Sequence, residues 1–294
     1  MKFYLLSPQG VPMNPVLFPA FAPTIKAAGH EFVADIREAD IVLWDLHGRG
    51  HEYSQSDLDY IKGKNVFVAT FDEWDRGFMS ADIWPYPLTR QQEEVFLEIK
   101  DDAVHFCRLL DKTKERPPNL RPYEKPILYE KPILPPIDLS NREFDVVYIA
   151  NDAPNRRQIA EALQADGRLN CHISLGAKKL EFDDFLRMHR RGKFFISSAA
   201  GGFTDERVQC LFSVSAIIRQ RTDQLLLHDF THLDNCLRID SPPTKQDLDT
   251  LVEICADRDK LFEIYMRGYK FVKQYYSKEY IAADILSKIE KHLL

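Results

Sequence analysis

The sequence predicts an α/β protein of two domains, each built on a parallel sheet. Short apolar segments alternate with helical segments in two separate runs, and a proline-rich stretch, residues 113–143, lies between the runs. The second run contains a strand, a glycine-rich turn, a helix and a strand in immediate succession, at residues 193–220, which is the order of a βαβ unit. Because the short apolar strands lack a clean alternation and are separated by helices, we expect a parallel sheet covered on both faces.

Length and composition limit the class of protein. The 294 residues suit about two domains, each able to bury its own core. Hydrophobic residues make up 45% and charged residues 29%, as in a globular protein. The net charge of -6 argues against a nucleic-acid partner. The chain has no apolar run of the ~18 residues that a membrane span needs, and Pro8 interrupts the N-terminus too early for a signal peptide.

Cysteine usage indicates a reducing compartment. The five cysteines, at positions 107, 171, 210, 236 and 255, include no CxxC pair, and most lie in apolar segments. We therefore expect buried reduced thiols rather than disulfides or a metal site, and a cytoplasmic protein.

The first run predicts an alternating series of strands and helices. The expected strands are Phe3–Ser7, Glu31–Ala34, Ile41–Trp44 and Val66–Thr70. The expected helices lie near Val16–Ala28, Ser56–Lys62 and Gln91–Lys100. Gly29 is placed to end the first helix, because glycine is the residue that most often follows a helix C-terminus.

Residues 113–143 interrupt this alternation. They contain seven prolines between Pro117 and Pro136 and a tandem YEKPIL repeat at residues 123–134. Proline restricts φ and removes a backbone donor, so we expect an extended, semi-rigid connection between the domains. The repeat as a peptide ligand for another protein is the alternative.

The second run restarts the alternation. The expected strands are Asp145–Ala150, Cys171–Leu175, Lys193–Ser197, Ser215–Ile218 and Leu237–Ile239. The expected helices are Pro154–Gly167, Phe182–Arg190, one starting near Thr204 or Asp205, and a helical stretch from Lys245 almost to the end, with breaks near Asp257 and Ser277.

The turn after Ser197 can serve as a phosphate site. Gly201 and Gly202 let the backbone approach an anion, and the following helix presents unpaired N–H groups at its N-terminus. Arg207 and Arg219 flank the turn and can add charge-assisted hydrogen bonds to a diphosphate. An ordinary βαβ connection with solvated arginines is the alternative interpretation.

Four segments of the second run together resemble the C-terminal, donor-binding domain of GT-B glycosyltransferases, in particular the group-1-like, spore-maturation-type and exostosin-like families. They are FDVVYIANDAPNRRQIAEAL, KFFISSAAGGFTDERVQCLFSVSAIIRQ, DLDTLVEICADRDKLFEIYMRGYKFV and YYSKEYIAADILSKIEKHLL. The resemblance covers about half of the chain, and the first run matches only in its order of strands and helices.

This resemblance implies two Rossmann-like domains facing a central cleft, with a C-terminal helix that crosses back to the first domain. The implied division is an acceptor-side domain (1–112), the linker (113–143), a nucleotide-sugar-binding domain (144–275) and a returning helix (276–294). The implied activity is hexosyl or pentosyl transfer from a donor such as a UDP- or GDP-sugar to a hydroxyl of a glycan or glycoconjugate, without a metal or a bound cofactor.

Donor-binding residues are expected after the strands of the second domain and in the loop after the first strand. They are Gln9, Gly10, Arg156, Arg157, Gly201, Gly202, Asp205, Glu206, Arg207 and Arg219. Arginines and helix N-termini in these positions would neutralise the leaving diphosphate. The chain departs from the family at Gln209, where many members have a glutamate that holds the ribose, and Asp205 or Glu206 is the replacement available.

A general base for an inverting reaction is expected in the first domain. Asp45 and His47 follow the strand IVLW, and Asp72 follows VFVAT; the ends of such strands are where an open α/β sheet places functional groups. A turn cap formed by Asp45 with Gly48 and Gly50 is the alternative.

Other charged segments give weaker signals. His228, Asp229 and His232 have metal-ligating side chains, but we expect them to line the nucleoside side of the cleft or to satisfy backbone groups. The basic stretch 187–193 is read as a solvated helix end, with weak contact to an anionic membrane surface as the alternative.

The sequence is also compatible with two other functions. One is a GT-B-like binding protein that has lost catalysis, which the glutamine at position 209 favours. The other is a dinucleotide-dependent oxidoreductase, which the single Gly10 after the first strand disfavours, because that class needs G-x-G-x-x-G.

Overall fold

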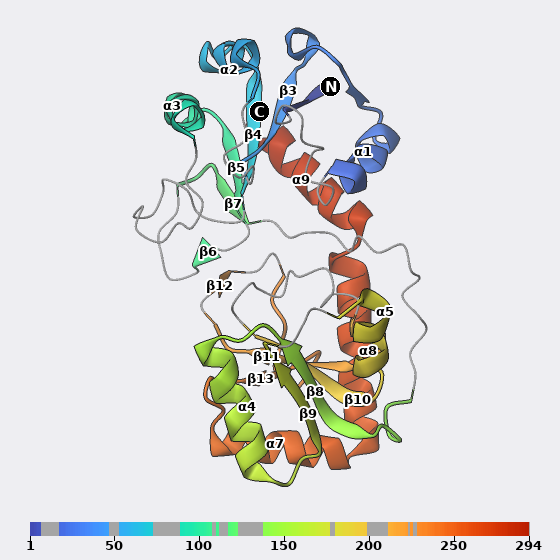
Figure 1. Cartoon of the computed structure of the whole chain (residues 1–294). Helices are drawn as coiled ribbons and strands as arrows, with labels where there is room; N and C mark the ends of the chain where they lie inside the picture. The colour runs from blue at the N-terminus through green and yellow to red at the C-terminus, as the bar shows by residue number, and fades with distance from the viewer. Residues whose placement is uncertain are drawn as a thin grey trace. The chain divides into compact units, whose positions relative to one another are not determined.

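The computed structural model describes residues 1–6, 18–46, 53–72, 89–107, 110–111, 117–122, 138–176, 180–198, 211–222, 224–225 and 228–293. The chain divides into two compact units. The first comprises residues 1–128, 223–227 and 278–294, and the second comprises residues 129–222 and 228–277. Each unit is an α/β layer structure with its own sheet (Figure 1).

The first unit is built on a six-stranded sheet in which every strand pair is parallel. The strands are β1 (Lys2–Leu6), β2 (Glu31–Phe32), β3 (Ile41–Asp45), β4 (Phe67–Asp72), β5 (Val104–Cys107) and β7 (Leu120–Pro122). Their order across the sheet is β2-β1-β3-β4-β5-β7. Successive strands are therefore added on opposite sides of β1, and the strand order reverses between β1 and β3. A separate antiparallel pair joins β6 (Leu110–Asp111) to β12 (Gln224–Leu225).

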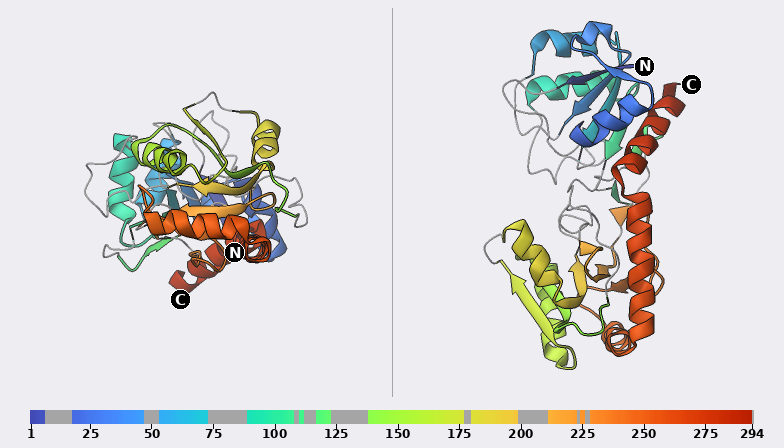
Figure 2. Two further views of the ribbon diagram at one scale, coloured as in Figure 1. Left: turned by 90° about the horizontal axis from the view of Figure 1, so that it is seen from below. Right: turned by 90° about the vertical axis from the view of Figure 1, so that its right-hand side faces the viewer.

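Helices cover both faces of this sheet. On one face, α2 (Gln55–Lys62) and α3 (Arg90–Ile99) pack over Val42, Trp44 and Val68. On the other lie α1 (Phe18–Ala27) and the C-terminal helix α9 (Lys278–Leu293), which appear side by side in Figures 1 and 2. Sequence chemistry sets the helix ends: Thr89 and Gln92 form a capping box before α3, and Gly29, at φ +82°, follows α1.

Three contacts hold α9 on the first unit although it comes last in the chain. Lys288 Nζ donates to the Pro122 carbonyl oxygen at 3.1 Å. Glu290 lies 3.8 Å from His30 Nε2, and the ring of His292 lies 5.5 Å from that of Phe67. The buried face of the helix carries isoleucines 281, 285 and 289. The expectation of a terminal helix that returns to the first domain is therefore confirmed.

The second unit is built on a five-stranded parallel sheet. Its strands are β8 (Phe144–Ala150), β9 (Cys171–Leu175), β10 (Gly192–Ser197), β11 (Ala216–Gln220) and β13 (Leu237–Ile239). The order is β13-β11-β10-β8-β9, so the reversal here falls between β8 and β10. Two parallel α/β sheets were expected from the sequence, and this expectation is confirmed.

One face of the second sheet carries the main core of that unit. Val146, Tyr148, Phe194 and Ile218 are buried there. The helices over them are α4 (Pro154–Asp166), α7 (Lys245–Ala256) and α8 (Arg258–Tyr275). The shorter helix α5 (Phe182–His189) packs against β10.

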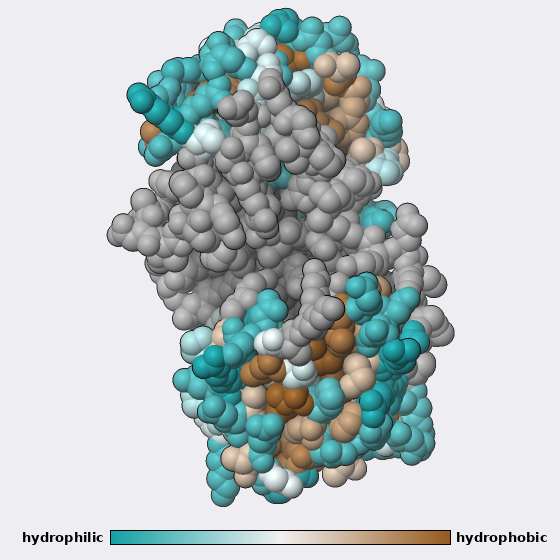
Figure 3. All heavy atoms as spheres, in the orientation of Figure 1, coloured by the Kyte–Doolittle hydropathy of each residue, from teal (hydrophilic) through white to brown (hydrophobic). Residues whose placement is uncertain are grey.

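The edge strand β9 is the least protected part of this sheet. All five of its residues are only partly buried. Figure 3 shows hydrophobic residues gathered on the viewed face of the second unit, where Figure 1 draws β8 and β9 between α4 and α5. This edge position agrees with the alternation in CHISL, in which Cys171, Ile173 and Leu175 pack against the core and His172 and Ser174 are polar.

Sequence reasoning placed most elements within two residues of their ends but missed two strands of the first sheet. β5, sequence VHFC, is short and follows the charged turn Asp101–Asp102, so it gave no strand signal. β7 comes from the proline-rich segment in which we expected a linker, and it pairs with β5 at the edge of the sheet. Proline is tolerated there because Pro122 ends an edge strand. The YEKPIL repeat lies outside the described residues.

Candidate functional site

Strand order defines where each sheet can hold a ligand. In an open parallel sheet, ligands bind outside the carboxyl ends of the strands, at the point where the strand order reverses. In the second unit this point lies between β8 and β10. The chain leaves β8 through Asn151 toward α4 and leaves β10 through Ser197 and Ser198.

Arg156 bridges this point. Its Nε donates to Ser198 Oγ at 3.0 Å, and its Nη1 donates to the Asn151 carbonyl oxygen at 3.0 Å. The side chain therefore ties the first turn of α4 to the ends of both β8 and β10. The sequence predicted Arg156 as a donor ligand, and the geometry places its charge at the position where a sheet of this order binds anions.

The N-terminus of α4 suits an anion for a second reason. Pro154 occupies the first turn, Ala153 supplies no side-chain cap, and the first turn contains no acidic residue. The first N–H groups of a helix have no intrahelical partner and carry a partial positive charge. The first turn itself thus adds no carboxylate, and the nearest one, Asp152 before the N-cap, is paired with Arg157.

Arg157 differs from its neighbour. Both Nε and Nη2 donate to the carboxylate of Asp152, and this hydrogen bonding holds the pKa of Asp152 below its ordinary value. The guanidinium of Arg157 is therefore matched by a carboxylate in this structure. Of the two predicted arginines, Arg156 is the one that lies across the strand ends.

Arg219 lies one strand further along the same edge. It is paired in register with Ser197 of β10 on one side and with Arg238 of β13 on the other. Only 5% of its surface is exposed, and its guanidinium lies 5.8 Å from the centre of the Phe230 ring. A buried arginine with its charge over an aromatic face is a pre-oriented cation.

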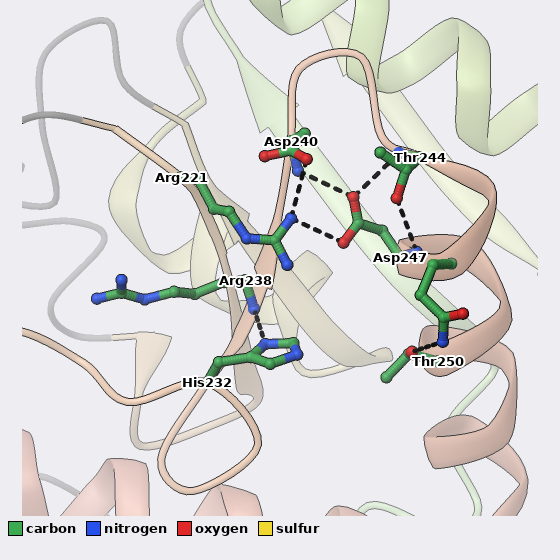
Figure 4. A network of polar contacts seen from close by, with 8 residues as sticks. Arg221, His232, Arg238, Asp240, Thr244, Asp247 and Thr250 are labelled. Carbon is green, nitrogen blue, oxygen red and sulfur yellow. Dashed lines mark hydrogen bonds and ion pairs between the residues drawn. The ribbon is translucent and has the colours of Figure 1, made fainter.

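A network of hydrogen bonds and ion pairs connects the residues that follow β11 and β13 to the start of α7 (Figure 4). Asp247, in the first turn of α7, forms a capping box with Thr244 and accepts from the Asp240 N–H at 3.1 Å and from Arg221 Nη1 at 2.9 Å. Burial alone would raise the pKa of Asp247, but these hydrogen bonds outweigh it and hold the pKa below its ordinary value. The network fixes the loop between β13 and α7.

In the first unit, two of the predicted base residues fall at corresponding strand ends. Asp45 is the last residue of β3 and pairs in register with Phe71, which precedes Asp72 on β4. Asp45 is 7% exposed, and its carbonyl oxygen accepts from the Tyr53 hydroxyl at 2.9 Å. The strand order of this sheet reverses between β1 and β3, so Asp45 ends a strand at that reversal.

Several predicted site residues lie outside what the structure describes. For Asp72 it describes the backbone only. The others are Gln9, Gly10, His47, Gly201, Gly202, Asp205, Glu206 and Arg207.

The histidine-rich segment is not arranged as a metal site. Within the described part of the chain, histidine, cysteine and carboxylate side chains form no group of three that could hold an ion. His228 stacks on Tyr275 with ring centres 4.2 Å apart, Asp229 is paired with Arg238 at 2.5 Å, and His232 Nδ1 accepts from the Arg238 N–H.

Most of the basic stretch 187–193 is neutralised by carboxylates. Arg187 pairs with Asp184, Arg191 binds Glu143 through two nitrogens, and Lys193 binds Asp145 at 2.8 Å. His189 is buried, and its Nδ1 donates to the Phe185 carbonyl oxygen at 2.8 Å. Such pairs leave little net positive charge for an anionic surface. Among the described residues, no helix is both long and apolar enough to cross a membrane.

The described cysteines carry no disulfide. Cys107 and Cys236 are buried, and Cys171 and Cys255 are partly buried. Burial raises the pKa of Cys171 and of Cys236 to about 12, which keeps these thiols protonated and unreactive.

Sequence reasoning missed several residues of this edge. The sequence indicated only a loop at Ser198 and gave no role to Asn155, Gln220 or Ser241. In the structure, Asn155 Nδ2 donates to Gln220 Oε1 at 3.0 Å. The Asn155 carbonyl oxygen accepts from Ser241 Oγ at 2.8 Å. Gln220 ends β11, Ser198 and Ser241 lie within two residues of the ends of β10 and β13, and Asn155 lies in the first turn of the helix that follows β8. That position is the signal that would have found them.

No family model matches the chain, and no curated protein matches it in sequence. Solved structures match it over nearly its full length. One is an α-glucosyltransferase in complex with UDP and a 13-mer DNA containing an HMU base, at 11% identity and TM-score 0.56, covering 99% of either chain. Another is Anabaena HepE in complex with UDP, at 10% identity and TM-score 0.58, covering 99% of this chain and 100% of that one.

A third match is a glycosyltransferase from Rickettsia africae, at 10% identity and TM-score 0.55, covering 99% of this chain and 98% of that one. The chain has the GT-B fold. The similarity extends through both units, whereas the sequence resemblance covered only the second. At such identities the GT-B likeness concerns architecture, and the reaction must be argued from the residues of this chain.

Replacing Asp247 tests the network that fixes the edge of the second sheet. Asp247→Ala removes a helix cap and a charged acceptor for Arg221, so we expect unfolding to become easier by about 2 kcal/mol or more. Asp249→Ala, in the same helix, removes a partly exposed ion pair with Arg168 and should cost less than ~1 kcal/mol. Urea denaturation followed by circular dichroism measures both; equal effects would contradict the role given to Asp247.

Proposed function

We propose that this GT-B protein is a glycosyltransferase that moves a sugar from a nucleotide-sugar donor to a hydroxyl group of a glycan or glycoconjugate. The observation that carries the proposal is the bridge from Arg156 to Ser198 and Asn151 across the strand reversal of the second sheet. Anabaena HepE and the α-glucosyltransferase were both solved with UDP, which supports a UDP-sugar as donor. A GDP-sugar is the other donor of the same chemical class.

The donor diphosphate would lie at the carboxyl edge of β8 and β10. There it meets the uncapped N-terminus of α4, the charge of Arg156 and, one strand away, the buried Arg219. The sequence predicts that Gly201, Gly202 and Arg207 lie in the turn and helix start after Ser198, and there they would complete the site. Arg157 would contribute less, because Asp152 already neutralises it.

In this mechanism the acceptor oxygen attacks the anomeric carbon while the bond from that carbon to the diphosphate breaks. The electron pair of the broken bond goes to the diphosphate, whose growing negative charge the arginines and the helix terminus stabilise. These groups would take the place of a divalent cation. Asp205 or Glu206 would hold the ribose, and Gln9 and Gly10 would contact donor phosphate from the first unit.

An inverting reaction also needs a group that takes the acceptor proton. Asp45 is our first candidate, because it ends a strand at the reversal of the first sheet and its backbone is anchored by Tyr53. His47 and Asp72 are the next candidates. A retaining reaction would proceed without such a base.

A binding protein that has lost catalysis is the second candidate function. Gln209 favours it, since many proteins of the resembling families have a glutamate there. Release of UDP from UDP-sugars separates the two: an enzyme turns the donor over, and a binding protein retains affinity for UDP without turnover.

Arg156→Ala tests the donor site. Loss of a charge-assisted contact should weaken UDP binding by about tenfold or more, with the fold retained, and Arg207→Ala should have a similar effect. Arg187→Ala is the matched control, because that arginine is 75% exposed and pairs with Asp184 in its own helix. Isothermal titration calorimetry measures all three. Wild-type affinity in the Arg156 and Arg207 variants would refute this assignment of the diphosphate.

Asp45→Asn tests the base. With an inverting enzyme, kcat should fall by about 10²–10⁴-fold while UDP affinity stays nearly constant, because the amide cannot accept the proton but occupies the same volume. The measurement is steady-state release of UDP with a donor and acceptor that the wild type uses. If Asp45→Asn and His47→Ala both keep wild-type turnover, the base is elsewhere, Asp72 being next, or the enzyme retains configuration.

A further inference from the structure

His232 presents a hydrogen-bond donor whose tautomer is fixed by the backbone. Its Nδ1 accepts from the Arg238 N–H at 2.9 Å, so that nitrogen carries no proton (Figure 4). In a neutral imidazole the proton then resides on Nε2, which can only donate. Burial lowers the pKa of His232, and the positive charge of Arg221 lowers it further, which agrees with a neutral ring.

This donor is unused within the protein. In the part of the chain that the structure describes, His232 Nε2 makes no hydrogen bond, although the side chain is partly buried. Among the described residues, the buried polar side-chain atoms that lack a partner do not include this nitrogen, so solvent or a ligand can reach it. Nε2 is therefore a candidate contact for a ligand.

The charges around the ring argue against a phosphate at this position. Arg221 is paired with Asp247 at 2.9 Å and with Asp240 at 3.1 Å, and Arg238 is paired with Asp229 at 2.5 Å. Two guanidinium groups thus face three carboxylates. The environment suits an uncharged polar group, in contrast to the start of α4, where no acidic residue lies in the first turn.

The loop that carries His232 is rigidly placed. Asn235 Oδ1 accepts from the Thr231 N–H at 2.8 Å, and the Asn235 carbonyl lies so close to Gly268 of α8 that a Cβ there would come within 2.7 Å of it. His232 is bonded to the backbone of Arg238, which pairs in register with Arg219. The ring is thus held one strand beyond the buried arginine of the proposed diphosphate site.

We propose that His232 is a nucleobase-recognition residue, whose Nε2–H donates to a carbonyl oxygen of the base of the donor nucleotide. This inference rests on the proposed function, since the donor diphosphate is assigned to the edge that ends at Arg219. A ribose hydroxyl can accept the same hydrogen bond, but ribose is common to UDP and ADP, so comparing these two nucleotides separates it from the base. Guanine and uracil carry such a carbonyl oxygen, whereas adenine presents an amino group in its place, so His232 favours uracil or guanine.

His232→Asn is the decisive variant. The side-chain oxygen of asparagine can take the place of Nδ1 and accept from the Arg238 N–H, but no donor remains at the position of Nε2. His172→Asn is the matched control, because His172 is also partly buried and lies on β9, at the opposite edge of the same sheet. Circular dichroism checks that both variants fold.

Calorimetric titrations of the full chain with UDP, ADP and inorganic pyrophosphate make the test. For His232→Asn we expect UDP to bind about three- to tenfold more weakly, with ADP and pyrophosphate changed by less than about twofold. His172→Asn should leave all three unchanged.

Three results would count against the inference. Unchanged UDP affinity in His232→Asn overturns the inference but leaves the proposed function standing. Equal weakening of UDP and ADP, or of UDP and pyrophosphate, overturns the assignment to the base. A wild-type protein that binds neither UDP nor GDP overturns the proposed function and this inference with it.

Discussion

After β8 and after β10, the chain crosses along the second sheet in opposite directions. The connection from β8 runs through α4 to the outer strand β9, whereas the connection from β10 leads to β11, on the side away from β8. Neighbouring strands therefore send their following loops apart, which opens the carboxyl edge at that point. Arg156 spans the opening through hydrogen bonds to Ser198 and to the Asn151 carbonyl. Every other assignment on this edge depends on that placement.

The carboxyl edge of the second sheet divides into two chemical environments. At the β8–β10 end, Arg156 and the N-terminus of α4, whose first turn contains no acidic residue, offer positive charge. At the β13 end, arginines are matched by carboxylates, and His232 offers a neutral N–H. A nucleoside diphosphate has a charged end and an uncharged end, so this division agrees with one ligand lying along the edge.

The sequence was sufficient for the class of fold because the signals were local. Apolar strand runs, Gly29 after the first helix and the breaks at Asp257 and Ser277 each act over a few residues, and the structure places helix ends there. β5 and β7 escaped prediction because their stability comes from pairing with each other and with β4, not from their own composition. Tertiary context of this kind is invisible in a single short segment.

The candidate site was predictable to a smaller extent. Arg156, Arg219 and Asp45 could be proposed from their positions at strand ends. The carboxylate partner of Arg157 could not be predicted, since Arg156 and Arg157 are adjacent in sequence and only the structure shows Arg157 held by Asp152. The tautomer of His232 likewise depends on a backbone N–H six residues further along the chain.

A crystal structure of the protein with UDP tests the central claim most directly. The account predicts density for the diphosphate at the carboxyl ends of β8 and β10, within hydrogen-bond distance of Arg156 or of the first N–H groups of α4. Density for UDP at any other place on the chain, with this edge occupied by solvent alone, would contradict it.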